Sequence, residues 1–225
     1  MRMFLKFSFC LIFAVFSAVL AYAGNGYYDG SKDAIALKKR ASSLITQNRG
    51  SAVLGSERVS ILLQVQDPLF YHHQGVDLKT AGTGLTTITQ SLSKRLAFND
   101  FKPGIGKIRQ TAYAMGLNKY LSKEEVLTLF IDTVPMGHSD DGWTVGLFNA
   151  SQSFFKKPVN ELNREEFIEL ISVMIAPSDL SPMTKGKNFE ERVSRINRLV
   201  DGQCRPLGNR DVWFEGCKLL PAVGA

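Results

Sequence analysis

Apolar residues recur at helical spacing along most of the chain, between short polar breaks. In residues 33–46 the apolar positions, Leu37 and Leu44 among them, alternate with basic side chains, and the polar stretch 48–51 ends the pattern. Ser122 and Asn163 each precede a glutamate by three residues, the spacing of a capping box at a helix start. Alternating strand patterns are scarce, so a single mainly α-helical domain is expected. The pattern predicts helices over 33–46, 107–121, 123–131, 164–176 and 189–200.

Two stretches have a less regular pattern. Residues 58–65 form a compact apolar run, and periodicity does not separate a buried helix from a strand there. Residues 24–31, GNGYYDGS, have the composition of turns and predict a loose leader.

The N-terminus has the pattern of a targeting segment. Arg2 and Lys6 precede an apolar run over 7–20, and Ala21-Tyr22-Ala23 has the small-x-small form of a signal-peptidase site. The stretch 7–23 is shorter than the roughly 20 residues that span a membrane comfortably. Residues 1–23 are therefore expected to be a signal peptide for export, with a retained short anchor as the alternative.

Composition and charge narrow the class of protein. The chain is 44% hydrophobic and 21% charged, which is ordinary for a globular domain. Its net charge is +6, and +4 without Arg2 and Lys6, too small a surplus for a nucleic-acid partner. The surplus suits a phosphate head group or a membrane surface, and equally a plain soluble surface. Cys204 and Cys217 are expected to pair in the exported chain, and no cysteine or histidine spacing indicates zinc.

Three polar segments are candidates for chemistry. Residues 66–77 contain Asp67, His72, His73 and Asp77, but adjacent histidines point apart and no metal-binding spacing is present, so no metal ligand is assigned. Residues 83–95 place threonines and backbone amides at a helix entry, which suits an anion or ordinary capping. Residues 107–125 bring Lys107 and Gln110 to one helix face, which is commonly just solvated.

Read in order, these segments resemble the motifs of the peptidoglycan glycosyltransferase family, which polymerises lipid II. Residues 66–77 fit E-D-x-x-F-x-x-H-x-G-x-D except at the first position, and residues 84–95 are similar to G-x-S-T-I-T-Q-Q-L-x-K-N. Lys107 and Gln110 fall on R-K-x-x-E, and further similarities continue to residue 200. The resemblance implies a mainly α, lysozyme-like, two-lobe domain over 56–200. It would follow a leader and helix over 24–55 and precede a disulfide-bonded tail over 201–225.

The departures from the motifs concern the reaction itself. The resemblance puts the family's general base at Gln66 and its second glutamate at Gln110, and an amide accepts no proton at physiological pH. Only residues 78–83 separate the first two motifs, where the family has a longer, membrane-facing stretch. The sequence therefore predicts an impaired glycosyltransferase that binds lipid II, glycan or a wall-synthesis partner.

Two alternatives remain open at this point. One is an active glycosyltransferase with a relocated base, either Asp67 or an acid of the segment 138–145, where Asp140 and Asp141 are expected near the cleft. The other is a lysozyme-like enzyme that cleaves glycan, which needs a carboxylic acid in the cleft.

The resemblance also implies ligands and a location. The ligand is a lipid-linked disaccharide diphosphate or a glycan strand at the periplasmic side of the inner membrane, with a wall-synthesis protein as a further partner and no nucleic acid. A divalent cation, Mg or Mn, is implied by resemblance only. The substrate-binding residues are expected to be His73, Thr86, Thr87, Thr89, Gln90, Lys94 and Lys107.

Overall fold

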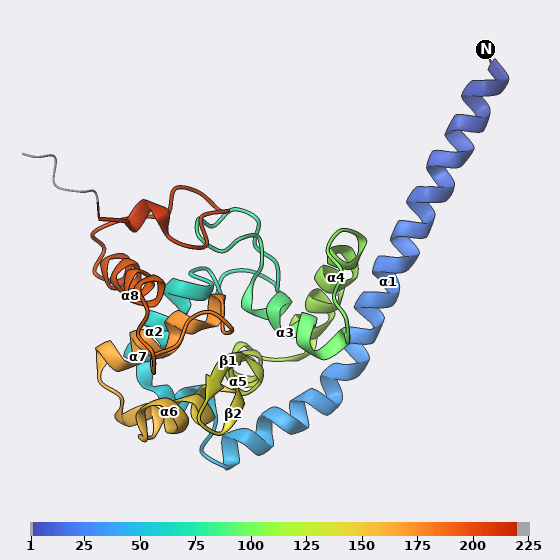
Figure 1. The fold of residues 1–225 in the computed structure, drawn as a ribbon. Coiled ribbons are helices and arrows are strands. Elements are labelled where there is room, and N and C mark those ends of the chain that lie inside the picture. The colour runs from blue at the N-terminus through green and yellow to red at the C-terminus, as the bar shows by residue number, and fades with distance from the viewer. Residues whose placement is uncertain (1, 220–225) are drawn as a thin grey trace, which may run out of the picture.

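The chain folds into two groups of helices, with one helix between them. The computed structural model describes residues 2–219, with side chains from residue 6 onward. Helices α1, α3 and α4 form one group and α2, α6, α7 and α8 the other, while α5 contacts α1, α3 and α6 (Figure 1). The α-helices are α1 (Arg2–Thr46), α2 (Gly55–Gln66), α3 (Ile88–Ala97), α4 (Ile105–Tyr120), α5 (Lys123–Thr133), α6 (Leu147–Phe155), α7 (Arg164–Ser172) and α8 (Lys187–Val200).

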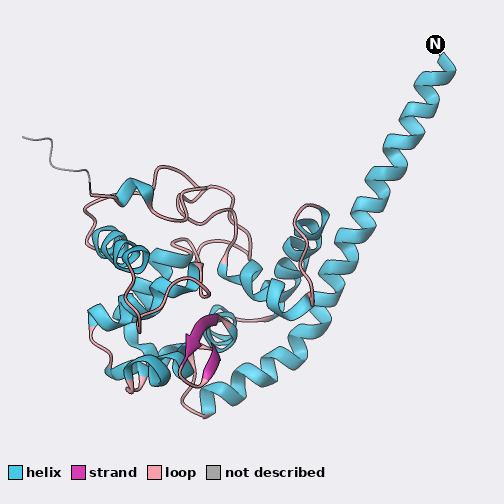
Figure 2. Cartoon of the chain, in the orientation of Figure 1, coloured by secondary structure: helices cyan, strands magenta, loops and turns pink. Residues whose placement is uncertain are grey.

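Short elements complete the fold. Among the described residues only two strands occur, paired in an antiparallel hairpin between α5 and α6 (Figure 2). The mainly α-helical expectation is therefore confirmed. The strands are β1 (Pro135–Ser139) and β2 (Gly142–Val145), and the 3-10 turns are η1 (Ser51–Leu54), η2 (Val159–Glu161), η3 (Val173–Ile175) and η4 (Glu215–Cys217).

Capping boxes fix where three helices begin. Ser122 caps α5 with Glu125, and Asn163 caps α7 with Glu166, as their spacing predicts. Thr87 caps α3 in the same way with Gln90. In each box the side chains satisfy backbone amides that have no partner within the helix. The compact apolar run 58–65, which periodicity left open, lies within α2.

Residues 24–31 do not form the loose leader that their composition predicts, because they continue α1. Gly26 and Gly30 let the backbone of α1 approach α4 closely: a Cβ on Gly30 would lie 2.3 Å from the Tyr113 carbonyl oxygen. Polar contacts support the same pairing, since Arg109 donates to Asp29 at 2.8 Å and the Tyr113 hydroxyl to Asp33 at 2.8 Å. The glycines therefore serve helix packing here, as small residues do between close helices.

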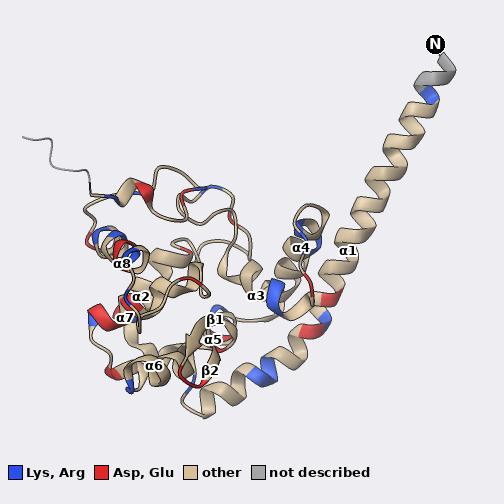
Figure 3. Ribbon diagram, in the orientation of Figure 1, with Lys and Arg blue, Asp and Glu red and all other residues tan. Residues whose placement is uncertain are grey.

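The first part of α1 projects away from the rest of the molecule. No charged residue lies between Lys6 and Asp29, and Figure 3 shows the uncoloured stretch of ribbon. An 18-residue window of this helix has a mean hydropathy of 2.1 and is 0% buried, so it is long and apolar enough to cross a membrane. A signal sequence near the N-terminus meets the same criterion. The helix therefore agrees with either a signal or an anchor.

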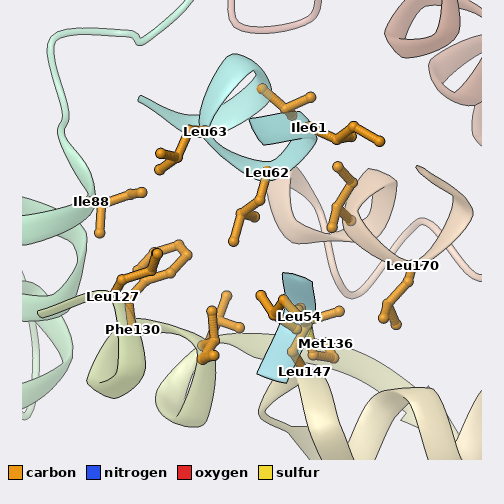
Figure 4. Close-up of a cluster of buried hydrophobic side chains, with 14 of the residues drawn as sticks. Leu54, Ile61, Leu62, Leu63, Ile88, Leu127, Phe130, Met136, Leu147 and Leu170 are labelled. Atoms are coloured by element: carbon orange, nitrogen blue, oxygen red, sulfur yellow. The ribbon is translucent and has the colours of Figure 1, made fainter. Parts of the chain in front are cut away.

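The hydrophobic core lies where α2, α5, α6 and α7 meet (Figure 4). Leu62 of α2, Leu147 of α6 and Leu170 of α7 are each 0% exposed, and Phe130 of α5 is 2% exposed. Burial of such side chains contributes about 1.5–3 kcal/mol each. This core fixes the end of α2, from which the candidate site begins.

Candidate functional site

A cavity of about 350 Å³ lies between the end of α2, the loop before α3, and α8. Three of the site residues predicted from the sequence line this cavity, namely Gln66, Thr86 and Thr87. No lining residue is a carboxylate, and one, Arg192, is charged. The lining residues are Val65, Gln66, Gly82, Thr83, Gly84, Thr86, Thr87, Ile88, Ser91, Phe130, Ile175, Arg192 and Val212.

Gln66 is the last residue of α2 and lines this cavity with a half-buried side chain. It occupies the position at which the resemblance places a general base. A carboxamide donates and accepts hydrogen bonds but takes no proton at neutral pH. Gln66 is therefore suited to orienting a ligand hydroxyl and unsuited to deprotonating it.

Asp67 has a structural setting. Its side chain is 0% exposed, accepts a hydrogen bond from His73 Nε2 at 2.9 Å, and accepts the backbone amide of Ile88 at 2.9 Å. His73 Nδ1 accepts from the Gly75 amide at 3.1 Å, so the proton of the neutral ring lies on Nε2. Asp67 thus joins the loop after α2 to the start of α3, and it is absent from the cavity lining. This arrangement gives no support to Asp67 as a relocated base.

The start of α3 carries the threonines of the predicted anion site. The Thr87 hydroxyl donates to the Gly75 carbonyl at 2.7 Å, and Thr86 Oγ1 accepts from Lys107 Nζ at 2.9 Å. Burial lowers the pKa of Lys107, and the nearby positive charge of Lys94 lowers it further. The Lys107 amine thus lies beside the cavity at Thr86, although Lys107 does not line the cavity.

Gln110 lies behind α3 and not in the cavity lining. It is 2% exposed, and its Nε2 donates to the backbone carbonyl of Gln90 at 2.7 Å. Its Oε1 is buried with no hydrogen-bond partner among the described residues. The two glutamine positions thus have different surroundings, one facing the cavity and one supporting α3.

The remaining predicted ligand residues also lie outside the lining. Gln90 completes the cap of α3 and donates from Nε2 to Thr111 Oγ1 at 2.9 Å. Thr89 is 0% exposed, and Lys94 is exposed, with its ammonium 5.1 Å from the Phe101 ring centroid. His73, as described above, orients Asp67. Some of the predicted residues therefore line the cavity, whereas the others support the segments that carry the lining residues.

The donor set does not fit the divalent cation that the resemblance implies. Mg²⁺ and Mn²⁺ bind through carboxylates and other oxygen donors. At Gln110 the nitrogen of the amide faces the neighbouring carbonyl, and the cavity lining has no carboxylate. Across residues 2–219 no group of three His, Cys, Asp or Glu side chains is arranged to hold a metal ion.

Asp140 and Asp141 do not lie at the cavity, contrary to expectation. They form the turn of the β1–β2 hairpin, where Ser139 pairs with Gly142, and both are exposed. The tight turn exposes this acidic pair to solvent, and neither residue lines the cavity. Neither acid is placed to act as a relocated base.

Sequence reasoning missed Arg192 and Val212. Arg192 of α8 is 3% exposed, donates from Nη1 to the Val212 carbonyl at 2.9 Å, and lies 4.2 Å from the Phe214 ring centroid. Its Nε has no partner among the described residues, and burial lowers its pKa to about 9, which leaves it protonated at neutral pH. In the sequence it is one of several basic residues on a charged helix, so no signal distinguished it.

Comparison with known proteins gives one consistent result. The sequence profile of the transglycosylase family, described as "Transglycosylase", matches residues 51–200. Penicillin-binding protein 1A of Clostridium perfringens (strain 13 / Type A) is 32% identical over 151 residues, which cover 60% of this chain and 22% of that protein. Penicillin-binding protein 1F of Bacillus subtilis (strain 168) is 26% identical over 201 residues, covering 82% of this chain and 27% of that protein. The aligned parts are thus between a fifth and a third of these two relatives' length.

Proposed function

The chain belongs to the transglycosylase family, and on that premise we propose that its cavity binds the sugar-diphosphate head group of a lipid-linked wall precursor without polymerising it. The domain is a lysozyme-like helical member of the peptidoglycan glycosyltransferases of cell-wall synthesis. The observation that carries the proposal is the chemistry of the cavity lining, which has an amide at the base position and no carboxylate.

The reaction of the family needs a proton acceptor that this cavity does not provide. When an acceptor hydroxyl attacks the anomeric carbon of a donor sugar, the new glycosidic bond forms, the diphosphate leaves, and the hydroxyl proton must move to a base. Gln66 holds no carboxylate for that proton. Loss of a positioned base costs typically about 10²- to 10⁴-fold in rate. Asp67 is engaged by His73 and Ile88, so it does not replace the missing base.

The charges around the cavity favour an anion. Arg192 lines it and Lys107 holds Thr86 at its edge, with no lining carboxylate to oppose them. Hydrogen bonds from charged donors to phosphate are about twice as strong as neutral ones. An active glycosyltransferase with a moved base and a glycan-cleaving enzyme both require an acid at the reacting bond. Because the lining has none, binding is the better-supported function.

We place this binding at a membrane surface, on its periplasmic side. The uncharged stretch between Lys6 and Asp29 is 22 residues of helix, about 33 Å at 1.5 Å per residue, close to the hydrocarbon thickness of a bilayer. A domain joined to such a helix meets lipid-linked ligands in the plane where they reside. Because the ligand is bound and not consumed, we propose that it passes to a partner protein of wall synthesis.

The test is a binding titration of the full chain in detergent with lipid II carrying a fluorescent label. We expect saturable binding, weakened about tenfold by Lys107→Met, because the change removes the hydrogen bond from Lys107 that positions Thr86 in the lining, and a hydrogen bond from a charged group is worth about 1.5 kcal/mol. Lys102→Met is the matched control, since the Lys102 side chain is 86% exposed and its ion pair among the described residues is with exposed Asp100, at 3.8 Å. Equal affinity of both variants, or no binding by the unmodified chain, would count against the proposal.

A further inference from the structure

The residues after the family match return to the cavity. Residues 201–219, here called the C-terminal segment, lie beyond the matched residues 51–200 and contain the disulfide between Cys204 and Cys217. In Figure 1 this segment, coloured red, runs beside the loop that precedes α3. It contributes Val212 to the cavity lining.

On one side the C-terminal segment is bonded to the short stretch between the first two motifs. The Gly82 amide donates to the Gly208 carbonyl at 3.0 Å, and the Gly84 amide donates to the Asn209 carbonyl at 2.6 Å. The fit is close, because a Cβ on Gly84 would lie 2.5 Å from Val212 Cγ1. Backbone hydrogen bonds and side-chain contact therefore both join the segment to this loop.

On the other side three arginines of α8 hold the same segment. Arg192, Arg195 and Arg198 donate to the carbonyls of Val212, Trp213 and Cys217 at 2.9, 3.0 and 3.0 Å. Arg195 also bonds to the carboxylates of Glu191 and Glu215. Phe214, at 1% exposed, is buried beneath these contacts. The segment thus bridges α8 and the loop before α3.

Building on the proposed function, we propose that the C-terminal segment is a specificity wall: it confines the cavity to a single anionic head group and excludes a glycan polymer. A cavity of about 350 Å³ is near the lower end of the range for small-molecule sites, about 300–1,000 Å³. A growing strand needs a long open groove, whereas here Val212 and Arg192 form part of the lining on the side of the C-terminal segment. Cys204 and Cys217 hold the two ends of the wall together.

The first test measures access to the cavity and needs no ligand. In a Cys10→Ser background, Ser91→Cys places a single free thiol in the cavity lining. The rate at which this thiol reacts with a polyethylene-glycol maleimide is compared in three proteins: the probe chain without further change, the probe chain with Val212→Ala, and the probe chain with Cys204→Ser/Cys217→Ser. For the double serine chain the probe thiol remains the only cysteine. A Ser56→Cys probe on α2, exposed and absent from the cavity lining, is the control.

We expect the bulky reagent to label the thiol at position 91 at least fivefold faster in Val212→Ala and at least tenfold faster without the disulfide, with the control probe unchanged. Val212→Ala keeps the disulfide, so it remains informative if the double serine chain fails to fold. Unchanged labelling of the cavity thiol in Val212→Ala and in the folded double variant would overturn the proposal.

The second test measures specificity for a soluble ligand. We expect the opened variants to gain at least tenfold in affinity for a hexasaccharide of the wall glycan relative to the unmodified chain, and affinity for lipid II is measured on the same variants. No gain for the hexasaccharide would overturn the wall's role in specificity. If no variant binds lipid II while access to the cavity thiol still increases, the wall stands and the proposed function fails.

Discussion

At the scale of single residues, the two glutamines at the family's glutamate positions have different consequences. Gln66 faces the cavity, whereas Gln110 is buried and uses its amide nitrogen to donate to the Gln90 carbonyl. A carboxylate at position 110 would bring an oxygen against that carbonyl and remove the donor. Restoring a glutamate is therefore tolerable at one position and costly at the other.

We predict that Gln110→Glu lowers the free energy of unfolding by about 2–3 kcal/mol at pH 7, because it buries an unpaired charge. Burial raises the pKa of such a carboxyl, so the loss should shrink as the pH falls and the protonated acid donates to the carbonyl again. Gln66→Glu, at a half-buried site, should change stability by less than about 0.5 kcal/mol. Urea unfolding at pH 7 and pH 4.5 measures both, and an equal loss in the two variants would contradict the assignment.

The charge on Lys107 predicts how ligand affinity varies with pH. Burial, together with Lys94, lowers the pKa of Lys107 below its ordinary value of 10.5. Raising the pH therefore neutralises this ammonium earlier than an exposed lysine, and affinity for labelled lipid II should begin to fall below the pH at which an ordinary lysine titrates. Lys107→Arg should hold its affinity over the same rise in pH, since a guanidinium stays protonated. The same fall in both proteins would assign the effect to another group.

Part of the site was predictable from the sequence because it lies in contiguous motifs. The cavity is lined by the last residue of α2, Gln66, and by the two residues that precede α3, Thr86 and Thr87. Arg192 and Val212 were not predictable, because their contact depends on residues 201–219 folding back over α8. Local patterns carry no information about such a return of the chain.

At the scale of elements, the pairing of α1 with α4 depends on glycines that a sequence pattern assigns to turns. A Cβ on Gly116 of α4 would lie 2.4 Å from the Tyr27 carbonyl oxygen, so glycines of both helices allow the two backbones to approach. The capping boxes of α5 and α7 were predictable because their side chains act within one turn. The helical state of residues 24–31 was not predictable, because it depends on contacts with α4, which is distant in the sequence. The β1–β2 hairpin was not predictable, because its strands are very short.

Two identical substitutions in α1 should have opposite effects. The Cβ that Gly30→Ala adds would lie 2.3 Å from the Tyr113 carbonyl oxygen. The helices must move apart to admit it, so the free energy of unfolding should fall by about 1–3 kcal/mol. Gly24→Ala has nothing within 4 Å and should stabilise the helix by about 0.5–1 kcal/mol. Thermal unfolding of the full chain in detergent should move Tm down for the first and up for the second. A similar shift in both would mean that α1 and α4 do not pack closely.

At the scale of the whole molecule, α1 connects a membrane-compatible helix to the domain without a break. Its apolar window is unburied, while its later turns are held by Asp29 and Asp33 against α4. Of the signal peptide expected from the sequence and its alternative, a retained anchor, we predict the anchor: the chain stays at the membrane and keeps its first 23 residues. Intact mass measurement of the protein from the membrane fraction tests this, and a chain that begins at Gly24 in the soluble periplasmic fraction would show a cleaved signal.

The proposed function is binding of a lipid-linked ligand without turnover. It is tested by a lipid II elongation assay run with a binding titration on the unmodified chain, on Gln66→Glu, and on Gln66→Glu/Gln110→Glu. We expect saturable binding and no polymer from the unmodified chain, and any gain of polymer only where Glu replaces Gln66. Polymer formed by the unmodified chain would overturn the proposal.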